Sequence, residues 1–364
     1  MIKSIVVPLA VAGVLAAGCG HPLIPAADLK PQPKITRPVA PYLSAPVVPY
    51  KVQRSVLGVD LYAPRNYTQA QTFTFGVRTI NYIKTVLHAK AVGILWDYYS
   101  PSRTTNVVQA TKRGTLTVAD VMTLTKIAKR AGLQVEYRPL IFIPSHQNNP
   151  WEGMLKPPNQ QKFFSNYFSA LWPYIKAAQK LHISEFVTAT EMHALNGSRL
   201  WKSFFTRVGK TYHGVVSYTA FYRDYFRPTG HLLPVRLYGM DMYKALPLKF
   251  TATQAQVTAA WEASFKTVPA AVLARTALDE EGLAARAGAY SLPPNLGAPG
   301  RLDQAVQARW FTAACKTVAR FHMRAVYFFK VNLADNPAEP SKALSVFEGR
   351  KGAVAISACA KLFG

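Results

Sequence analysis

One repeated pattern constrains the fold more than any other feature of the chain. Short runs rich in β-branched and aromatic residues alternate with longer stretches that carry apolar residues at helical spacing. Such strand–helix alternation is typical of a parallel sheet covered by helices. The sequence therefore predicts an α/β fold, a (β/α)8 TIM barrel over residues 52–364. The predicted strands are 55–62, 91–99, 133–143, 183–191, 214–221, 235–243, 270–280 and 324–333.

The stretches between these runs predict the helices of the barrel. The clearest are 77–90, 117–132, 159–181 and 349–363. The second opens on Thr117, a favourable N-cap residue, and closes at Gly132, which suits a helix C-terminus. The fifth unit is the exception, because residues 221–233 show little helical pattern.

The first residues, MIKSIVVPLAVAGVLAAGCG, have the pattern of a secretory signal: Lys3, an apolar stretch too short to span a membrane, then small residues. The ending LAAGC resembles the lipobox of bacterial lipoproteins. It predicts a lipoprotein signal peptide over residues 1–18 and lipidation of Cys19; the alternative is an ordinary cleaved signal in which Cys19 has no special role. Residues 19–51 are rich in proline and predict an extended tether. We expect a lipid anchor in the cell envelope, in the outer membrane because Gly20 rather than Asp follows the cysteine.

Two further cysteines, Cys315 and Cys359, fall in the last two predicted helices. In an oxidising compartment they either form a disulfide or remain two separate buried thiols, and the sequence leaves both alternatives open. No Cys and His spacing suggests a zinc site, and no glycine-rich loop suggests phosphate binding. We therefore expect neither a metal nor another cofactor.

The chain is strongly basic, with 43 Lys and Arg against 18 Asp and Glu and a formal net charge of +25. Such a balance favours anionic partners. The cations are scattered, with no basic run and no nucleic-acid-binding module, so nucleic acid is not an expected partner. We interpret the charge as a basic surface that faces lipopolysaccharide or an acidic polymer, on a protein expected to be monomeric.

Two glutamates end predicted strands: Glu191 the fourth and Glu280 the seventh. The C-terminal ends of the strands carry the active site of a TIM barrel. Two facing carboxylates suffice to hydrolyse a glycosidic bond, one as proton donor and one as nucleophile or base. Glu281 competes with Glu280, because side chains alternate across a strand. The predicted substrate-binding residues at the strand ends are Trp96, Asp97, Trp151, His193 and Tyr243.

These segments together resemble the retaining β-glycosidases built on (β/α)8 barrels, and among them glycoside hydrolase family 113. The likeness extends over residues 58–356 and is carried by LWDYYSPSR, WEGMLKP, VTATEMHAL, YGMDMYKAL, DEEGLAARAGAY and FEGRKGAVAI. The resemblance implies a retaining β-glycoside hydrolase acting on an oligo- or polysaccharide, with β-mannan as the default substrate. It makes Glu191 the general acid/base and, by the Glu-x-Gly pattern that ends at Gly282, Glu280 the nucleophile.

The resemblance also implies roles for other residues. Tyr243 matches a tyrosine that hydrogen-bonds the nucleophile, and Arg286 would keep the nucleophile ionised. Trp151 and Trp201 would be platforms for sugar rings, and Arg286 and Phe328 would also be substrate-binding residues.

The chain departs from the family pattern in three places. Thr190 stands where many relatives have Asn, Phe328 and Phe329 stand where a Trp is common, and Glu152 stands where related sequences tend to carry a basic residue. These departures leave open a second function, a catalytically inactive barrel lipoprotein that binds glycan of the cell envelope.

Overall fold

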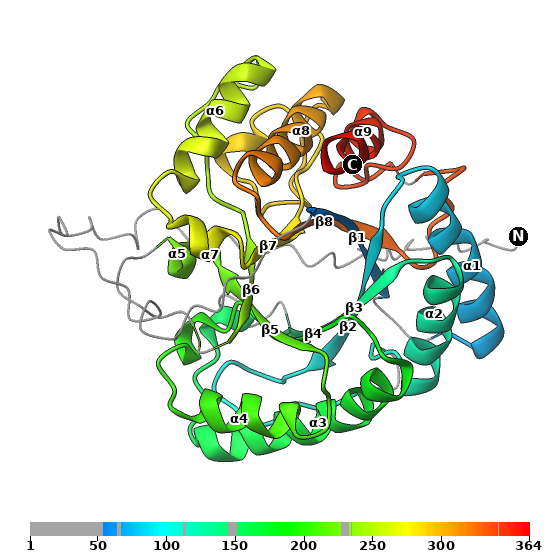
Figure 1. Cartoon of the computed structure of the whole chain (residues 1–364), viewed down its shortest axis with the longest axis vertical. Helices are drawn as coiled ribbons and strands as arrows, with labels where there is room; N and C mark the ends of the chain where they lie inside the picture. Colours follow the sequence, from blue (N-terminus) through cyan, green and yellow to red (C-terminus); the bar gives the residue numbers. More distant parts are fainter. Residues whose placement is uncertain are drawn as a thin grey trace, which may run out of the picture.

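The computed structural model describes residues 54–63, 67–111, 114–144, 151–226, 233, 235–340 and 342–364. The predicted signal peptide, Cys19 and the tether lie outside these residues. Eight parallel strands pair in sequence order and close into one barrel, with helices around it (Figure 1). The predicted TIM-barrel fold is therefore confirmed. In the described part of the chain, no helix is long and apolar enough to cross a membrane.

The barrel strands are β1 Val56–Ala63, β2 Ala91–Tyr99, β3 Gln134–Phe142, β4 Glu185–Thr190, β5 Val215–Phe221, β6 Leu237–Asp241, β7 Thr276–Glu281 and β8 Ala325–Asn332. The α-helices are α1 Gln69–Thr85, α2 Val118–Arg130, α3 Gln160–Leu181, α4 Leu200–Gly209, α5 Tyr222–Tyr225, α6 Gln254–Phe265, α7 Ala270–Leu273, α8 Gln304–Arg320 and α9 Lys351–Phe363. Short 3-10 helices are η3 Glu152–Met154, η4 His193–Leu195 and η5 Ala289–Ser291.

Two predicted elements differ from the structure. The seventh strand starts only at Thr276, because residues 270–273 form the short helix α7 after Pro269. The first helix starts at Gln69 rather than at residue 77, because Thr68 and Gln71 form a capping box ahead of the apolar stripe.

Side chains of the strands alternate between the barrel interior and the layer beneath the helices. This alternation is interrupted near the C-terminal ends of β4, β7 and β8, where the registers with β5, β8 and β1 shift by a residue. Such bulges re-aim side chains and are common beside active sites. All three lie at the barrel end that carries the two predicted catalytic glutamates.

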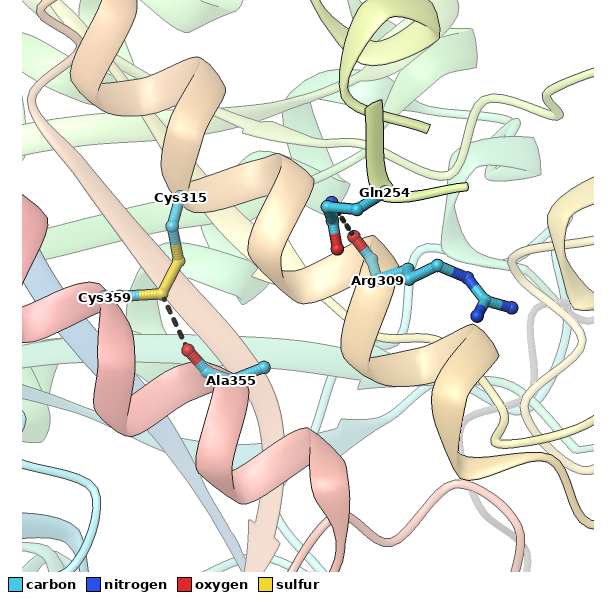
Figure 2. The surroundings of a disulfide bond; sticks show 5 residues. All are labelled: Gln254, Arg309, Cys315, Ala355 and Cys359. Atoms are coloured by element: carbon cyan, nitrogen blue, oxygen red, sulfur yellow. Dashed lines mark hydrogen bonds between the residues drawn. A yellow bond between two sulfur atoms is a disulfide. The ribbon is translucent and has the colours of Figure 1, made fainter. Parts of the chain in front are cut away.

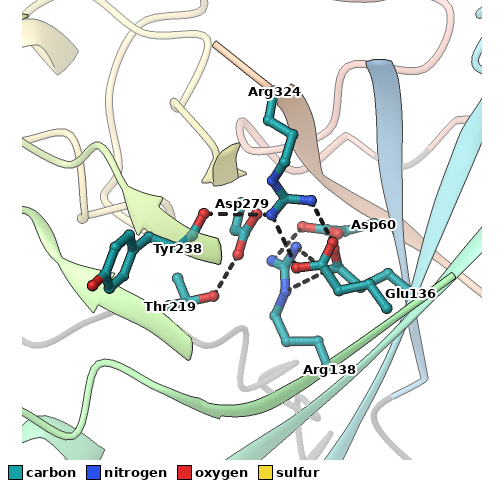
Figure 3. A network of polar contacts seen from close by, with 8 residues as sticks. Asp60, Glu136, Arg138, Thr219, Tyr238, Asp279 and Arg324 are labelled. Carbon is teal, nitrogen blue, oxygen red and sulfur yellow. Dashed lines mark hydrogen bonds and ion pairs between the residues drawn. The ribbon is translucent and has the colours of Figure 1, made fainter. Parts of the chain in front are cut away.

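The middle of the barrel holds charged rather than apolar side chains. Arg138 is fully buried and donates to Glu136 at 2.7 and 3.1 Å and to Asp60 at 3.1 Å. Arg324 forms a second buried pair with Glu185. Figure 3 shows both guanidinium groups among carboxylates from several strands. Burial raises the pKa of Asp60 and of Glu136, and the charge of Arg138 only partly offsets this rise.

Cys315 on α8 and Cys359 on α9 form a disulfide, with their Cα atoms 5.7 Å apart (Figure 2). The alternative of two separate thiols is therefore wrong. The bond links helices that already pack against each other, and it closes a segment of 44 residues. A link of this span typically stabilises a fold by about 2–4 kcal/mol, mainly by restricting the unfolded chain.

Candidate active site

Glu191 follows the last residue of β4 and has an unusual backbone. Its φ is +48°, in the left-handed region that residues other than glycine rarely adopt. The other described non-glycine residues with positive φ, His88, His182 and His322, lie just past the ends of helices. The Glu191 amide donates to Thr219 O at 2.8 Å and so ties this conformation to β5. Conformations of this kind cost about 1–3 kcal/mol and cluster at functional sites.

The Glu191 carboxylate accepts a hydrogen bond from Trp151, whose Nε1 lies 2.7 Å from Oε2. The Trp151 ring lies across the backbone of Gly153, where a Cβ atom would fall 2.3 Å from the ring. Glycine in the WEG segment is therefore needed to seat the indole. The same ring stacks on His193 at 6.2 Å and packs on Phe221 at 4.6 Å. Glu191 thus lies against an aromatic wall.

His193 is held at the rim of this wall by residues that sequence reasoning missed. Its Nδ1 hydrogen-bonds both carboxylate oxygens of Asp224, at 2.7 and 2.8 Å. Asn196 also donates to Asp224 and accepts from Tyr218, so the loop after β4 is tied to β5 and α5. About a third of the His193 side chain is exposed, which leaves the ring accessible beside Trp151.

Glu280 lies on β7 and accepts a hydrogen bond from the Tyr243 hydroxyl at 2.8 Å. Gly282 leaves room for that hydroxyl, because a Cβ there would lie 3.1 Å from it. The neighbouring Glu281 pairs in register with Phe328, and its carboxyl lies beside the Trp310 indole of α8. The two glutamates therefore face opposite sides of the barrel wall, with Glu280 on the side of Tyr243.

Asp241, at the end of β6, lies near both predicted catalytic glutamates. It pairs in register with Glu280, and neither of its buried carboxylate oxygens has a hydrogen-bond partner among the described residues. Burial raises its pKa well above the ordinary value, and the charges of Glu280 and Glu191 raise it further. Both glutamates are thus close enough to act on one carboxyl. The sequence alone does not reveal that Asp241 lies near both glutamates.

A second polar group lies at the same end of the barrel, on β1, β2 and β8. The Tyr62 hydroxyl donates to Asp97, and Lys330 Nζ lies 3.8 Å from the centre of the Tyr62 ring. Burial raises the pKa of Asp97 to about 6, while the Tyr62 hydrogen bond and the charge of Lys330 oppose this rise. Asp97 therefore lies among polar groups at the end where Glu191 and Glu280 are found.

Two predicted substrate-binding residues, Trp96 and Phe328, face the helices instead of the barrel interior. Trp96 is fully buried and stacks on Tyr174 of α3 at 4.7 Å. Phe328 is also fully buried and packs on Phe311 of α8 at 4.8 Å. Neither ring reaches the barrel mouth, so both predictions are wrong. Strand alternation places Phe329, the neighbour of Phe328, in the interior cluster with Tyr62.

Trp201 and Arg286 also differ from their predicted roles. Trp201 is 1% exposed and lies on α4, where it stacks on Phe205 at 5.4 Å and donates to the Leu195 carbonyl. The prediction of a sugar platform is wrong, because packing covers its ring. The Arg286 guanidinium donates to the carbonyl of Ala287 in its own loop at 3.3 Å. That Arg286 keeps the nucleophile ionised stays a prediction.

The polar groups at this barrel end fit a sugar better than a metal. Among the described residues, no group of three or more His, Cys, Asp or Glu side chains is arranged to hold a metal ion. Thr190 Oγ1, like the Asp241 carboxyl, is buried without a hydrogen-bond partner in the described part of the chain. Buried polar atoms are nearly always paired, so these atoms are suited to accept or donate hydrogen bonds to a polar ligand.

Comparison with known proteins decides the family. The family model described as Glycoside Hydrolase Family 113 matches residues 77–330 of the sequence. The chain belongs to glycoside hydrolase family 113. This family 113 protein is therefore a glycoside hydrolase, which confirms the predicted family and enzyme class. No curated protein matches the sequence.

Solved structures show the same fold at low sequence identity. A family 113 β-1,4-mannanase superposes with a TM-score of 0.71 at 14% identity, over 85% of this chain and 99% of that chain. The family 113 β-mannanase AaManA from Alicyclobacillus acidocaldarius gives 0.69 at 14% identity, over 86% and 99% of the two chains. A GH5_18 protein from Streptomyces cattleya gives 0.55 at 13% identity, over 85% and 80%. Identities this low support the barrel fold and leave the substrate and the catalytic residues to be argued from this chain.

Proposed function

We propose that this family 113 glycoside hydrolase cleaves a β-1,4-mannan-like polysaccharide with retention of configuration. Glu191 serves as the general acid/base and Glu280 as the nucleophile. The observation that carries the proposal is that both glutamates, at the ends of β4 and β7, act on the buried carboxyl of Asp241. The substrate class rests on the printed descriptions of the family 113 neighbours as mannanases.

The proposed reaction is a double displacement. Glu191 donates a proton to the glycosidic oxygen while Glu280 attacks the anomeric carbon and forms a covalent glycosyl–enzyme. Water deprotonated by Glu191 then releases the sugar, and the two inversions together retain the β configuration. The Tyr243 hydroxyl, 2.8 Å from Glu280, supports this role because a hydrogen bond to a carboxylate favours its ionised form.

The surrounding groups would orient the sugar. The partly exposed His193 ring offers an aromatic surface beside Glu191, and the Trp151 indole, only 5% exposed, supports it from behind. Thr190 and Asp241 contribute buried polar atoms that have no hydrogen-bond partner among the described residues. Asp97 of β2, whose carboxylate accepts from Tyr62, supplies a further acceptor.

The proposal is tested by following hydrolysis of soluble β-1,4-mannooligosaccharides by proton NMR. We expect the first reducing-end product to be the β-anomer, because double displacement retains configuration. An initial α-anomer would contradict the retaining mechanism. A well-folded protein that is inert on mannan, glucan and xylan would favour the alternative function, a glycan-binding barrel without catalysis.

We also propose that the barrel is displayed on the outer membrane as a monomeric lipoprotein. Residues 1–18 would be removed as a signal peptide, Cys19 would carry the lipid, and residues 19–51 would form the tether. Cys19→Ala is expected to move the protein from the membrane fraction to the soluble fraction of a bacterial lysate. Pro22→Ala is the control, since it changes the tether and leaves the cysteine. A wild-type protein found in the soluble fraction would rule out the anchor.

A further inference from the structure

The outer face formed by α3 and α4 carries many cations and no carboxylate. Residues 153–184 contain four Lys, residues 192–223 contain three Arg and two Lys, and neither stretch contains Asp or Glu. The two acids between them, Glu185 and Glu191, are buried in the barrel. Asp224, the next acid along the chain, is also buried. The positive charge of this face is therefore not neutralised by acidic side chains of its own elements.

The same face is hollowed. Two shallow, open hollows of about 310 and 490 Å³ lie on α3 and α4, and they adjoin because Arg207 and Lys210 line both. Arg199 and Lys202 line one part, and Trp172 of α3 lines the other. We call this feature the α3–α4 groove.

The groove combines its cations with aromatic rings. The Arg207 guanidinium lies 3.7 Å from the centre of the Phe168 ring, which fixes it on the wall of the groove. Trp172 is 36% exposed, with Lys176 Nζ 5.6 Å from its ring centre. The five other tryptophans of the chain, all in its described part, are at most 5% exposed. An accessible ring beside cations suits a sugar that carries negative charge.

The groove also starts near the active site. Arg199 lines one end of the groove. It is the N-cap of α4 and follows η4, the short helix that begins with His193. From there the groove extends along α4 to Lys210 at the far end of the helix. One end of the groove therefore lies close to the barrel mouth. A lipid surface is a poorer match, because membrane-binding helices present several apolar side chains, whereas Trp172 is the one large exposed apolar residue on α3 and α4, both fully described.

We propose that the α3–α4 groove binds an acidic polysaccharide, a polymer of sugars bearing carboxylate or sulfate groups, at a site distinct from the catalytic glutamates. Arg199, Lys202, Arg207 and Lys210 pair with the acidic groups, and Trp172 stacks on a sugar ring. The groove holds the polymer beside the barrel mouth. This binding does not depend on the proposed hydrolysis, so an experiment that excludes one of the two proposals does not exclude the other.

The test measures binding of a polygalacturonate oligosaccharide to the full chain by calorimetry and by tryptophan fluorescence. Arg207→Glu with Lys210→Glu is expected to weaken binding at least tenfold at low salt, because each reversed charge repels the polymer. The matched control is Lys266→Glu with Lys316→Glu, which gives the same net charge. These two exposed lysines belong to the α6 and α8 side of the barrel, opposite α3 and α4 (Figure 1). The control is expected to change the affinity less than twofold.

Two further readouts probe the chemistry of the groove. Trp172→Phe should abolish the fluorescence change on binding, since the other tryptophans are buried. Raising the salt from 50 to 200 mM should weaken binding strongly, as it does for polyanions that release counterions. Neutral mannohexaose should not respond to the double charge reversal.

Three outcomes would overturn the proposal. Equal loss of affinity in the groove variant and its control would mean that net charge alone attracts the polymer. Groove-dependent binding of mannohexaose would show that acidic groups are not recognised. Groove-dependent binding of phosphatidylglycerol vesicles or single-stranded DNA, without binding of polygalacturonate, would assign the groove to another class of polyanion.

Discussion

Glu280→Gln is expected to lower kcat on a β-1,4-mannan at least about 10³-fold, because an amide cannot attack the anomeric carbon. The substitution keeps the size of the side chain and the oxygen that accepts from Tyr243 at 2.8 Å. Folding should therefore be preserved, and KM should change far less than kcat. Steady-state kinetics with a soluble mannan, together with a thermal melt, measure both effects.

Glu281→Gln is the matched control for this prediction. Glu281 is fully buried beside Trp310, and burial raises its pKa well above the ordinary value. Burial therefore favours its neutral form, and glutamine is a close substitute in shape. We expect kcat within about threefold of wild type, on the general behaviour of substitutions away from the chemistry. An inactive Glu281 variant beside an active Glu280 variant would reverse the assignment.

Azide separates the two proposed catalytic roles. With an aryl β-mannoside whose leaving group needs no proton, azide should restore turnover to Glu280→Gly and yield the inverted α-glycosyl azide. For Glu191→Gly, azide should instead attack the covalent intermediate and yield the β-glycosyl azide, because Glu280 still performs the first displacement. The same product from both variants would exclude a double displacement with these residues.

The fold was predictable because its signal is repeated. Eight apolar runs with helical segments between them define a barrel even when single boundaries are wrong, as at Thr276. The positions of Glu191 and Glu280 at strand ends follow from the same pattern, since the ends of parallel strands share one face. Local chemistry also helped, because Thr117 caps α2 as its sequence position indicates.

The orientation of individual side chains was less predictable. Large aromatic residues suit a sugar site, which favours Trp96 and Phe328 in the sequence, but alternation on each strand turns both rings toward the helices, onto Tyr174 and Phe311. Bulges make it harder to predict which side chains point inward. One extra residue in a strand reverses the inward and outward orientation of every side chain that follows. On β8 this register shift lies next to Phe329.

Contacts between residues far apart in the chain could not be predicted from the sequence. The loop after β4 depends on Asp224, whose partners Asn196 and His193 precede it by about 30 residues. The charged barrel interior did leave a signal, namely Glu136 and Arg138 inside an otherwise apolar strand. That signal could not name Asp60 as the third member, because Asp60 lies 78 residues from Arg138.

Arg138→Met is expected to destabilise the barrel by about 3–5 kcal/mol, the usual cost of removing one partner of a buried ion pair. Arg138 is fully buried and donates to Glu136 and Asp60, and its guanidinium lies 5.6 Å from the ring centre of Tyr327. Methionine fills part of the space but leaves both carboxyls without their cation. Urea unfolding monitored by circular dichroism measures the loss.

The loss of stability in Arg138→Met should be larger at high pH than at low pH. Burial already raises the pKa of Asp60 and of Glu136, and Arg138 opposes this rise. Without the arginine these pKa values rise further, so the folded variant holds protons that the unfolded chain releases. The stability that these protons give the folded variant is fully present below the ordinary carboxyl pKa. It is lost as the pH rises through the raised pKa values of Asp60 and Glu136. The deficit of Arg138→Met should therefore be smaller at pH 4 than at pH 8.

Arg320→Met is the control, because Arg320 forms an ion pair with Glu262 while 60% of its side chain is exposed. A surface pair of this kind contributes at most about 1 kcal/mol, so its loss should be small. A second variant separates charge from packing: Arg138→Met combined with Asp60→Asn and Glu136→Gln removes the unpaired acids. If charge causes the instability, this triple variant should recover much of it and lose the pH dependence. A deficit that is the same at pH 4 and pH 8 and persists in the triple variant would assign the effect to packing around Tyr327 instead.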